Sequence, residues 1–73
     1  MYRIDITNNE AGYMFEEVTK VEYTDAIGET VIVSGDDLFT HKYPTSSNLH
    51  VFCKDCNSVI DADDIKAIHV SKS

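Results

Sequence analysis

Alternation of apolar and polar residues with a period of two is the feature that most constrains how this chain can fold. It runs through 2–7 and returns over 29–33, 49–54 and 58–61. Successive side chains of a strand point to opposite faces, so this period predicts strands that place one face on a core. Gly, Asn, Asp and Ser gather between these runs, where turns are expected. We therefore expect an all-β, mainly antiparallel fold.

A second strand is expected to begin near Tyr13, with Tyr13 and Phe15 on one face. The alternation then breaks, because Val18 and Val21 are the next apolar residues and the step between them is odd. Either a β-bulge or a single helical turn produces such a step. We favour a bulge, because the Val, Thr and Tyr residues around it prefer strands.

The end of the chain combines a helical turn with a last strand. Asp63 or Asp64 is expected to cap one turn, in which Ile65 and Ile68 face the core together. The run 64–70, Asp-Ile-Lys-Ala-Ile-His-Val, resembles the helical turn and last strand of small SH3-like barrels. The resemblance implies a five- to six-stranded SH3-like barrel with one short helical turn before the last strand. It implies no function, since such barrels carry many unrelated activities.

The chain has 73 residues and 42% apolar residues, which fits one folded domain over 1–73 and argues against disorder. No stretch reaches the roughly 18 apolar residues of a membrane span, and the first residues lack the apolar core of a signal peptide. We expect a cytoplasmic protein. A domain of this size buries only about 60% of its unfolded surface, so self-association is a reasonable source of added stability.

Charge narrows the choice of partners. Thirteen acidic and six basic side chains give a formal net charge of −7, and the basic residues are scattered. Direct nucleic-acid binding and docking on an anionic membrane both need clustered Lys and Arg, so neither is expected. The sequence also lacks the nucleophile, phosphate-loop and zinc-protease motifs of common enzymes, and we expect no enzymatic activity. Asp61 does not begin a calcium-binding loop. Ile65 stands where such a loop has a ligand, and Lys66 stands where it requires Gly.

The stretch 34–48 is predicted to be a long loop between strands, with one helical turn near Leu38 capped by Asp36. Loops of this length are often binding elements. The candidate binding residues in it are Leu38, Phe39, His41 and Tyr43. The alternative is that the apolar side chains fold back onto the core. A split, with Leu38 inward and the rings outward, also remains open.

Phe52 is a further candidate binding residue. Its parity is opposite to that of Leu49, Val51 and Cys53, so it is exposed if those three face the core. An exposed Phe on a strand would mark a subunit contact.

Cys53 and Cys56 form a Cys-x-x-Cys pair at a predicted hairpin turn, and 51–60 resembles one knuckle of a zinc ribbon. In such knuckles the residue after the second Cys, here Asn57, accepts positive φ. A tetrahedral zinc site needs two more ligands, from His41, His50 or His69, or from the Cys pair of a second chain. His50 is disfavoured, because an odd step separates it from Cys53 on the strand. The ordinary interpretation is packing without any cofactor; zinc and, more weakly, thiol redox chemistry are the alternatives.

These observations predict a small acidic protein that acts as a non-enzymatic binding module, through another protein or through its own copies. Two alternatives remain. One is an inhibitor that mimics nucleic acid, as small acidic proteins of phages and mobile elements do. The other is a zinc-stapled dimer built on Cys53 and Cys56.

Overall fold

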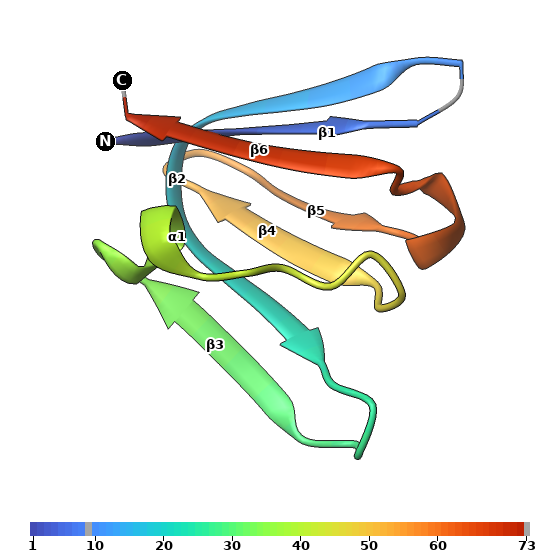
Figure 1. The fold of residues 1–73 in the computed structure, drawn as a ribbon. Helices are drawn as coiled ribbons and strands as arrows, with labels where there is room; N and C mark the ends of the chain where they lie inside the picture. The colour runs from blue at the N-terminus through green and yellow to red at the C-terminus, as the bar shows by residue number, and fades with distance from the viewer. Residues whose placement is uncertain (9, 73) are drawn as a thin grey trace.

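The structure, a computed structural model, describes residues 1–8 and 10–72, which form a mostly antiparallel six-stranded sheet (Figure 1). This confirms the all-β prediction. The strands are β1 (Tyr2–Thr7), β2 (Gly12–Thr24), β3 (Thr30–Ser34), β4 (Leu49–Cys53), β5 (Asn57–Ile60) and β6 (Ala67–Lys72). Two short helical elements, α1 (Asp37–Thr40) and the 3-10 turn η1 (Ala62–Asp64), lie between them. Neither element in the described part of the chain is long or apolar enough to cross a membrane.

The long strand β2 organises the sheet. Its first half pairs with β1, and its second half pairs with β4 on one edge and β3 on the other. The strand order is β5-β4-β2-β1-β6, with β3 joined to β2 alone. The described strands do not close on themselves, so the prediction of an SH3-like barrel is not confirmed. The edges of β3, β5 and β6 that face away from their partners have no strand beside them among the described residues.

The odd step between Val18 and Val21 belongs to a bulged region, which confirms that prediction. The register shifts between Phe15 and Val18 against β1, and again between Val18 and Lys20 against β4. Glu17, inside the first shift, has a φ of 54° and is the non-glycine residue with positive φ in the described ranges. The extra residues increase the local bend of β2 and let it serve both halves of the sheet.

The core is a single cluster of apolar side chains from the strands, α1 and the η1–β6 connection. No polar or charged residue of the described chain is buried. The buried residues are Ile4, Ile6, Phe15, Val18, Val21, Val33, Leu38, Leu49, Val51, Ile60 and Ile65.

The predicted helix caps are wrong in detail. Asp36 precedes α1 but makes no side-chain capping bond; its carboxylate accepts a hydrogen bond from the Tyr2 hydroxyl instead. At η1 the cap position belongs to Asp61, while Asp63 and Asp64 lie within the turn. The acids therefore do not act as the expected caps.

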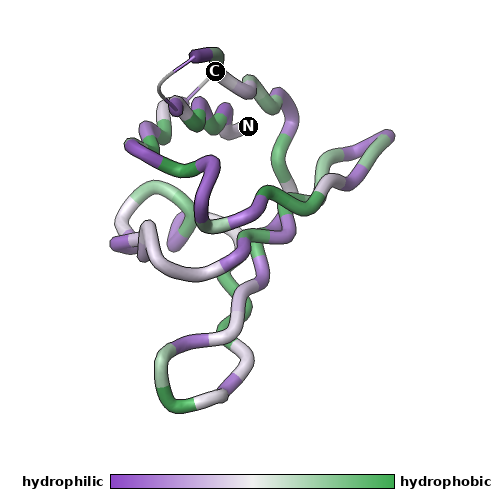
Figure 2. The backbone as a smooth tube through the Cα atoms, turned by 90° about the vertical axis from the view of Figure 1, so that its right-hand side faces the viewer, coloured by the Kyte–Doolittle hydropathy of each residue, from purple (hydrophilic) through white to green (hydrophobic). Residues whose placement is uncertain are grey.

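The β2–β3 hairpin forms a projecting arm at the bottom of Figures 1 and 2. Its turn is fixed by Asp25, whose Oδ1 accepts hydrogen bonds from the backbone N–H of Ile27 at 3.0 Å and of Glu29 at 2.9 Å. Gly28 takes the positive φ that this turn requires. Ile27 at the tip is 79% exposed. β3 reaches the core through Val33 and in part through Val31, and the turn beyond them projects away from the core.

Candidate functional site

Residues 37–45, which we name the bridging segment, run between β3 and β6. Figure 1 shows α1 and the chain after it lying between these two strands, and α1 contacts both. Irregular chain therefore lies between these two strands, where no strand pairing joins them among the described residues. The predicted loop 34–48 thus contains a helical turn, as expected, and occupies a defined place in the fold.

The helical turn of the bridging segment divides its two apolar residues between core and solvent. Leu38 is buried in the core, whereas Phe39 is 49% exposed. The Phe39 ring lies 6.4 Å from that of Tyr2, and Lys72 Nζ lies 5.4 Å from its centroid. This is the split arrangement that the sequence left open. Leu38 anchors the turn and Phe39 is available to a partner.

Three rings hold the rest of the bridging segment in place. The Tyr23 hydroxyl lies 2.7 Å from His41 Nε2, and the rings of His41 and Tyr43 meet edge to face at 5.0 Å. The Tyr43 hydroxyl donates to the Leu38 carbonyl at 2.8 Å. Burial, and to a lesser degree the nearby Tyr23, raises the pKa of Tyr43 to about 12. Tyr43 is half-buried and packs against the core, so it acts first as an anchor of the segment.

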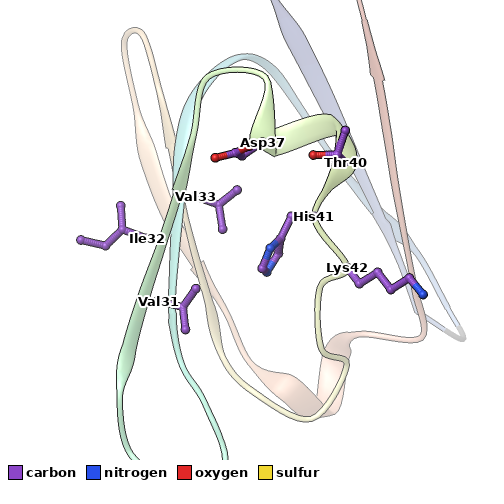
Figure 3. A pocket seen from close by; sticks show the side chains of 7 residues that line it. All are labelled: Val31, Ile32, Val33, Asp37, Thr40, His41 and Lys42. Atoms are coloured by element: carbon purple, nitrogen blue, oxygen red, sulfur yellow. The ribbon is translucent and has the colours of Figure 1, made fainter.

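Two open grooves flank the bridging segment. The first, of about 540 Å³, lies between it and β3 (Figure 3). The second, of about 390 Å³, lies between it and β6. His41 and Lys42 line both grooves, and Phe39 and Tyr43 line the second. The sequence-predicted residues Phe39, His41 and Tyr43 are thus brought together at one surface.

Phe52 does not belong to this surface. It lies on the outer face of β4, stacked on His50 with ring centroids 4.0 Å apart and with Lys20 Nζ 4.5 Å above its ring. These neighbours leave Phe52 partly buried, so the expectation of an exposed ring is wrong. The parity argument itself is correct, because Leu49 and Val51 are buried on the opposite face.

The Cys pair lies at the β4–β5 turn. In the strand order, β5 and β6 are at opposite ends of the sheet. Cys53 N–H donates to the Cys56 carbonyl at 2.7 Å, and both thiols are free. Burial is the largest cause that raises the pKa of Cys53 to about 11, followed by a hydrogen bond with the Cys56 side chain. Asn57 does not take the positive φ that the zinc-knuckle resemblance implies. Within 1–8 and 10–72, no three His, Cys, Asp or Glu side chains gather as a metal site.

The unpaired edge of β3 is not among the features predicted from the sequence. Its signal was the uncharged run Thr-Val-Ile-Val-Ser over 30–34, placed between the acids Glu29 and Asp36. That run predicts a strand but does not say which of its edges stays unpaired.

A comparison of the chain with models of protein families, with curated proteins and with solved structures finds no match. The fold and this site therefore define the protein only as a small all-β chain with two grooves beside a bridging segment.

Proposed function

We propose that this chain is a non-enzymatic protein-binding module whose partner occupies the grooves beside the bridging segment. The observation that carries the proposal is the position of Phe39: a large apolar ring, half exposed, on a turn that Leu38 fixes to the core. Rigidly held aromatic side chains are the usual anchors of protein interfaces. The absence of common catalytic motifs in the sequence supports a non-enzymatic role.

We also infer that the open sheet is a variant of the SH3-like barrel. In this variant the bridging segment, in place of strand pairing, lies between β3 and β6 and leaves a groove on each side. Two features support the inference: the bent β2 that serves both halves of the sheet, and the turn η1 directly before β6.

The test is capture of binding partners by the intact chain and by Phe39→Ala. Partners that bind through the bridging segment are expected to be lost with Phe39→Ala and kept with Val59→Ala. Val59 is a suitable control, because it is also an exposed apolar residue but lies on β5, outside both grooves. Equal retention by the two variants would exclude the second groove, which Phe39 lines, as the binding surface. Tyr43 is unsuitable for this test, because its loss would also disturb the segment.

Mimicry of nucleic acid is the second candidate. It is supported by the net charge of −7 and by a small depression where Glu10, Asp63 and Asp64 meet. It predicts a complex with a basic nuclease that weakens steeply as salt is added. A titration that detects no salt-sensitive complex would count against it.

A further inference from the structure

The free edge of β3 presents the backbone groups of alternate residues. The Asp25 N–H donates to the Glu29 carbonyl at 2.8 Å, so this pair is hydrogen-bonded. In an antiparallel ladder bonded and non-bonded pairs alternate. The pairs Tyr23–Val31 and Val21–Val33 are therefore bonded across β2 and β3. It follows that the N–H and C=O groups of the intervening residues point outward, and these residues are Thr30, Ile32 and Ser34.

This edge opens into the first groove. In Figure 3 the side chains of Val31 and Val33 point toward His41, and the side chain of Lys42 extends away from them. Ile32 points to the other side of β3 and is 59% exposed. Over the described residues, no hydrogen bond joins β3 to the bridging segment. The groove thus has an apolar wall beside a strand edge whose outward backbone groups pair with no other strand of the described chain.

The edge lacks the usual protection against strand pairing. Natural edge strands carry Lys, Pro or a bulge, whereas β3 is Thr-Val-Ile-Val-Ser and pairs with β2 in unbroken register. Acidic residues instead stand at both of its ends, with Glu29 before the strand and Asp36 and Asp37 after it. Asp37 lines the groove, and Figure 3 shows its carboxylate turned toward β3.

We propose that the partner of this module is an extended peptide that adds a strand to the free edge of β3. The peptide has an uncharged, β-branched centre flanked by Lys or Arg. A five-residue strand is about 16 Å long, so basic residues at both ends of a centre of that length reach the acids. Main-chain hydrogen bonds supply affinity in such strand addition, and the flanking charges supply specificity. This inference rests on the proposed binding function and names its partner class.

The same charges disfavour a second copy of the chain as the occupant. Two β3 strands paired antiparallel about Ile32 place Glu29 of each copy opposite Gly35 of the other, next to Asp36. Like charges brought together across strands are destabilising, and each copy already carries a net charge of −7. A partner with basic residues at both ends of its strand is instead attracted by Glu29, Asp36 and Asp37.

The test uses a synthetic peptide, Lys-Lys-Val-Thr-Val-Thr-Val-Lys-Lys, and a control in which Glu replaces every Lys. Titration calorimetry with the intact chain is expected to detect the basic peptide and not the acidic one. Ile32→Pro removes one outward N–H while leaving the pairing with β2, as edge positions tolerate Pro. It should weaken binding at least about tenfold, since a lost main-chain hydrogen bond and the ring both oppose strand addition. The matched control Ile32→Thr keeps the N–H and should bind within about threefold of the original.

The following outcomes would overturn strand addition at β3. Equal binding by Ile32→Pro, or by the acidic peptide, overturns strand addition at β3. Concentration-dependent dimers that Ile32→Pro abolishes also overturn it, because the edge would then serve a second copy. If Ile32→Pro fails to fold by circular dichroism, the chain with N-methylated Ile32, made by chemical synthesis, replaces it. Partners lost with Phe39→Ala but kept with Ile32→Pro would overturn this inference and leave the proposed function standing. Partners lost with Ile32→Pro but kept with Phe39→Ala would support strand addition and limit the binding surface to the first groove, which Phe39 does not line. Partners kept with both variants would remove the proposed function as well.

Discussion

Glu17 is the residue whose backbone is least suited to its side chain. Its φ of 54° lies in the left-handed region, where a residue with a Cβ is strained and Asn is better tolerated. Glu17 is exposed, and its carbonyl accepts the Lys54 N–H at 3.1 Å, a bond that any residue can make. The conformation is therefore imposed by the bulge and not by the Glu side chain.

Replacement of Glu17 by Asn is expected to stabilise the fold by about 0.5–1 kcal/mol, because it relieves this strain. Urea denaturation followed by circular dichroism measures the change. Glu16→Asn is the matched control, since Glu16 is also exposed, carries the same charge and has no positive φ. Equal stabilisation by both variants would mean that loss of charge, and not backbone strain, is responsible.

Tyr43, which is half-buried, contributes a hydrogen-bonded hydroxyl to the bridging segment. Tyr43→Phe removes the hydrogen bond to the Leu38 carbonyl and should cost about 0.5–1.5 kcal/mol of the free energy of unfolding. Tyr13→Phe, at an exposed site on β2, should change that free energy by less than about 0.5 kcal/mol. The two variants are compared by urea denaturation at neutral pH, where an unchanged midpoint for Tyr43→Phe contradicts the anchoring role.

The raised pKa of the Tyr43 phenol predicts that the stability of the fold depends on pH. The folded pKa of about 12 lies above the ordinary value of 10, because burial disfavours the phenolate. The unfolded chain therefore loses the proton first. The stabilising contribution of the neutral phenol is complete below pH 10 and is lost as the pH rises through 12. Absorbance titration should show a tyrosine that ionises near pH 12, and this component should be missing in Tyr43→Phe. The pKa of Tyr2 is also raised, by its hydrogen bond to Asp36, and its late ionisation should remain in that variant.

At the scale of elements, local pattern predicted the strands well. The alternation over 2–7 and 49–54 became β1 and β4, and the odd step from Val18 to Val21 became a bulged region. Such patterns succeed because each strand of a small sheet has one face on a shared core. The odd step is visible in the sequence for the same reason, because the apolar residues after a bulge must again point into the core.

Features that depend on distant residues could not be predicted in the same way. Asp36 fits a helix cap by its position, but the hydroxyl of Tyr2, 34 residues away, competes for its carboxylate. Phe52 has the parity of an exposed residue, but Lys20 and His50 cover part of its ring. The free edge of β3 follows from the order of strands in space, which the sequence of this strand does not contain.

The pairing of β3 makes a prediction for hydrogen exchange. The amides of Val31 and Val33 point toward β2 and should exchange slowly, whereas that of Ile32 points outward and should exchange fast. Exchange followed residue by residue with NMR provides the measurement. Protection of Ile32 equal to that of its two neighbours would show that the outward edge is already occupied.

At the scale of the whole molecule, the net charge of −7 and the small core have opposite effects on self-association. A chain of 73 residues gains stability from any added contact, yet copies that approach each other carry the same charge. An assembly of identical copies therefore needs an interface strong enough to offset this repulsion. The sequence offers two such interfaces, the Phe52 face and a zinc site shared by two Cys pairs. In each chain the Cys53 thiol, whose pKa is raised, would have to lose its proton to bind the metal.

Native mass spectrometry of protein purified without chelator compares these possibilities in one spectrum. We expect a monomer without metal at micromolar concentration, because the charge opposes association and each chain offers two thiols at the turn. A dimer with one zinc, lost in Cys56→Ser, would instead establish Cys53 and Cys56 as ligands and make self-association the main property of the protein. A metal-free dimer that Phe52→Ala dissociates would locate the contact on the outer face of β4. Both of these contacts lie away from the bridging segment, so either dimer would leave the two grooves open to a foreign partner, and only a dimer that Ile32→Pro dissociates would close the first of them.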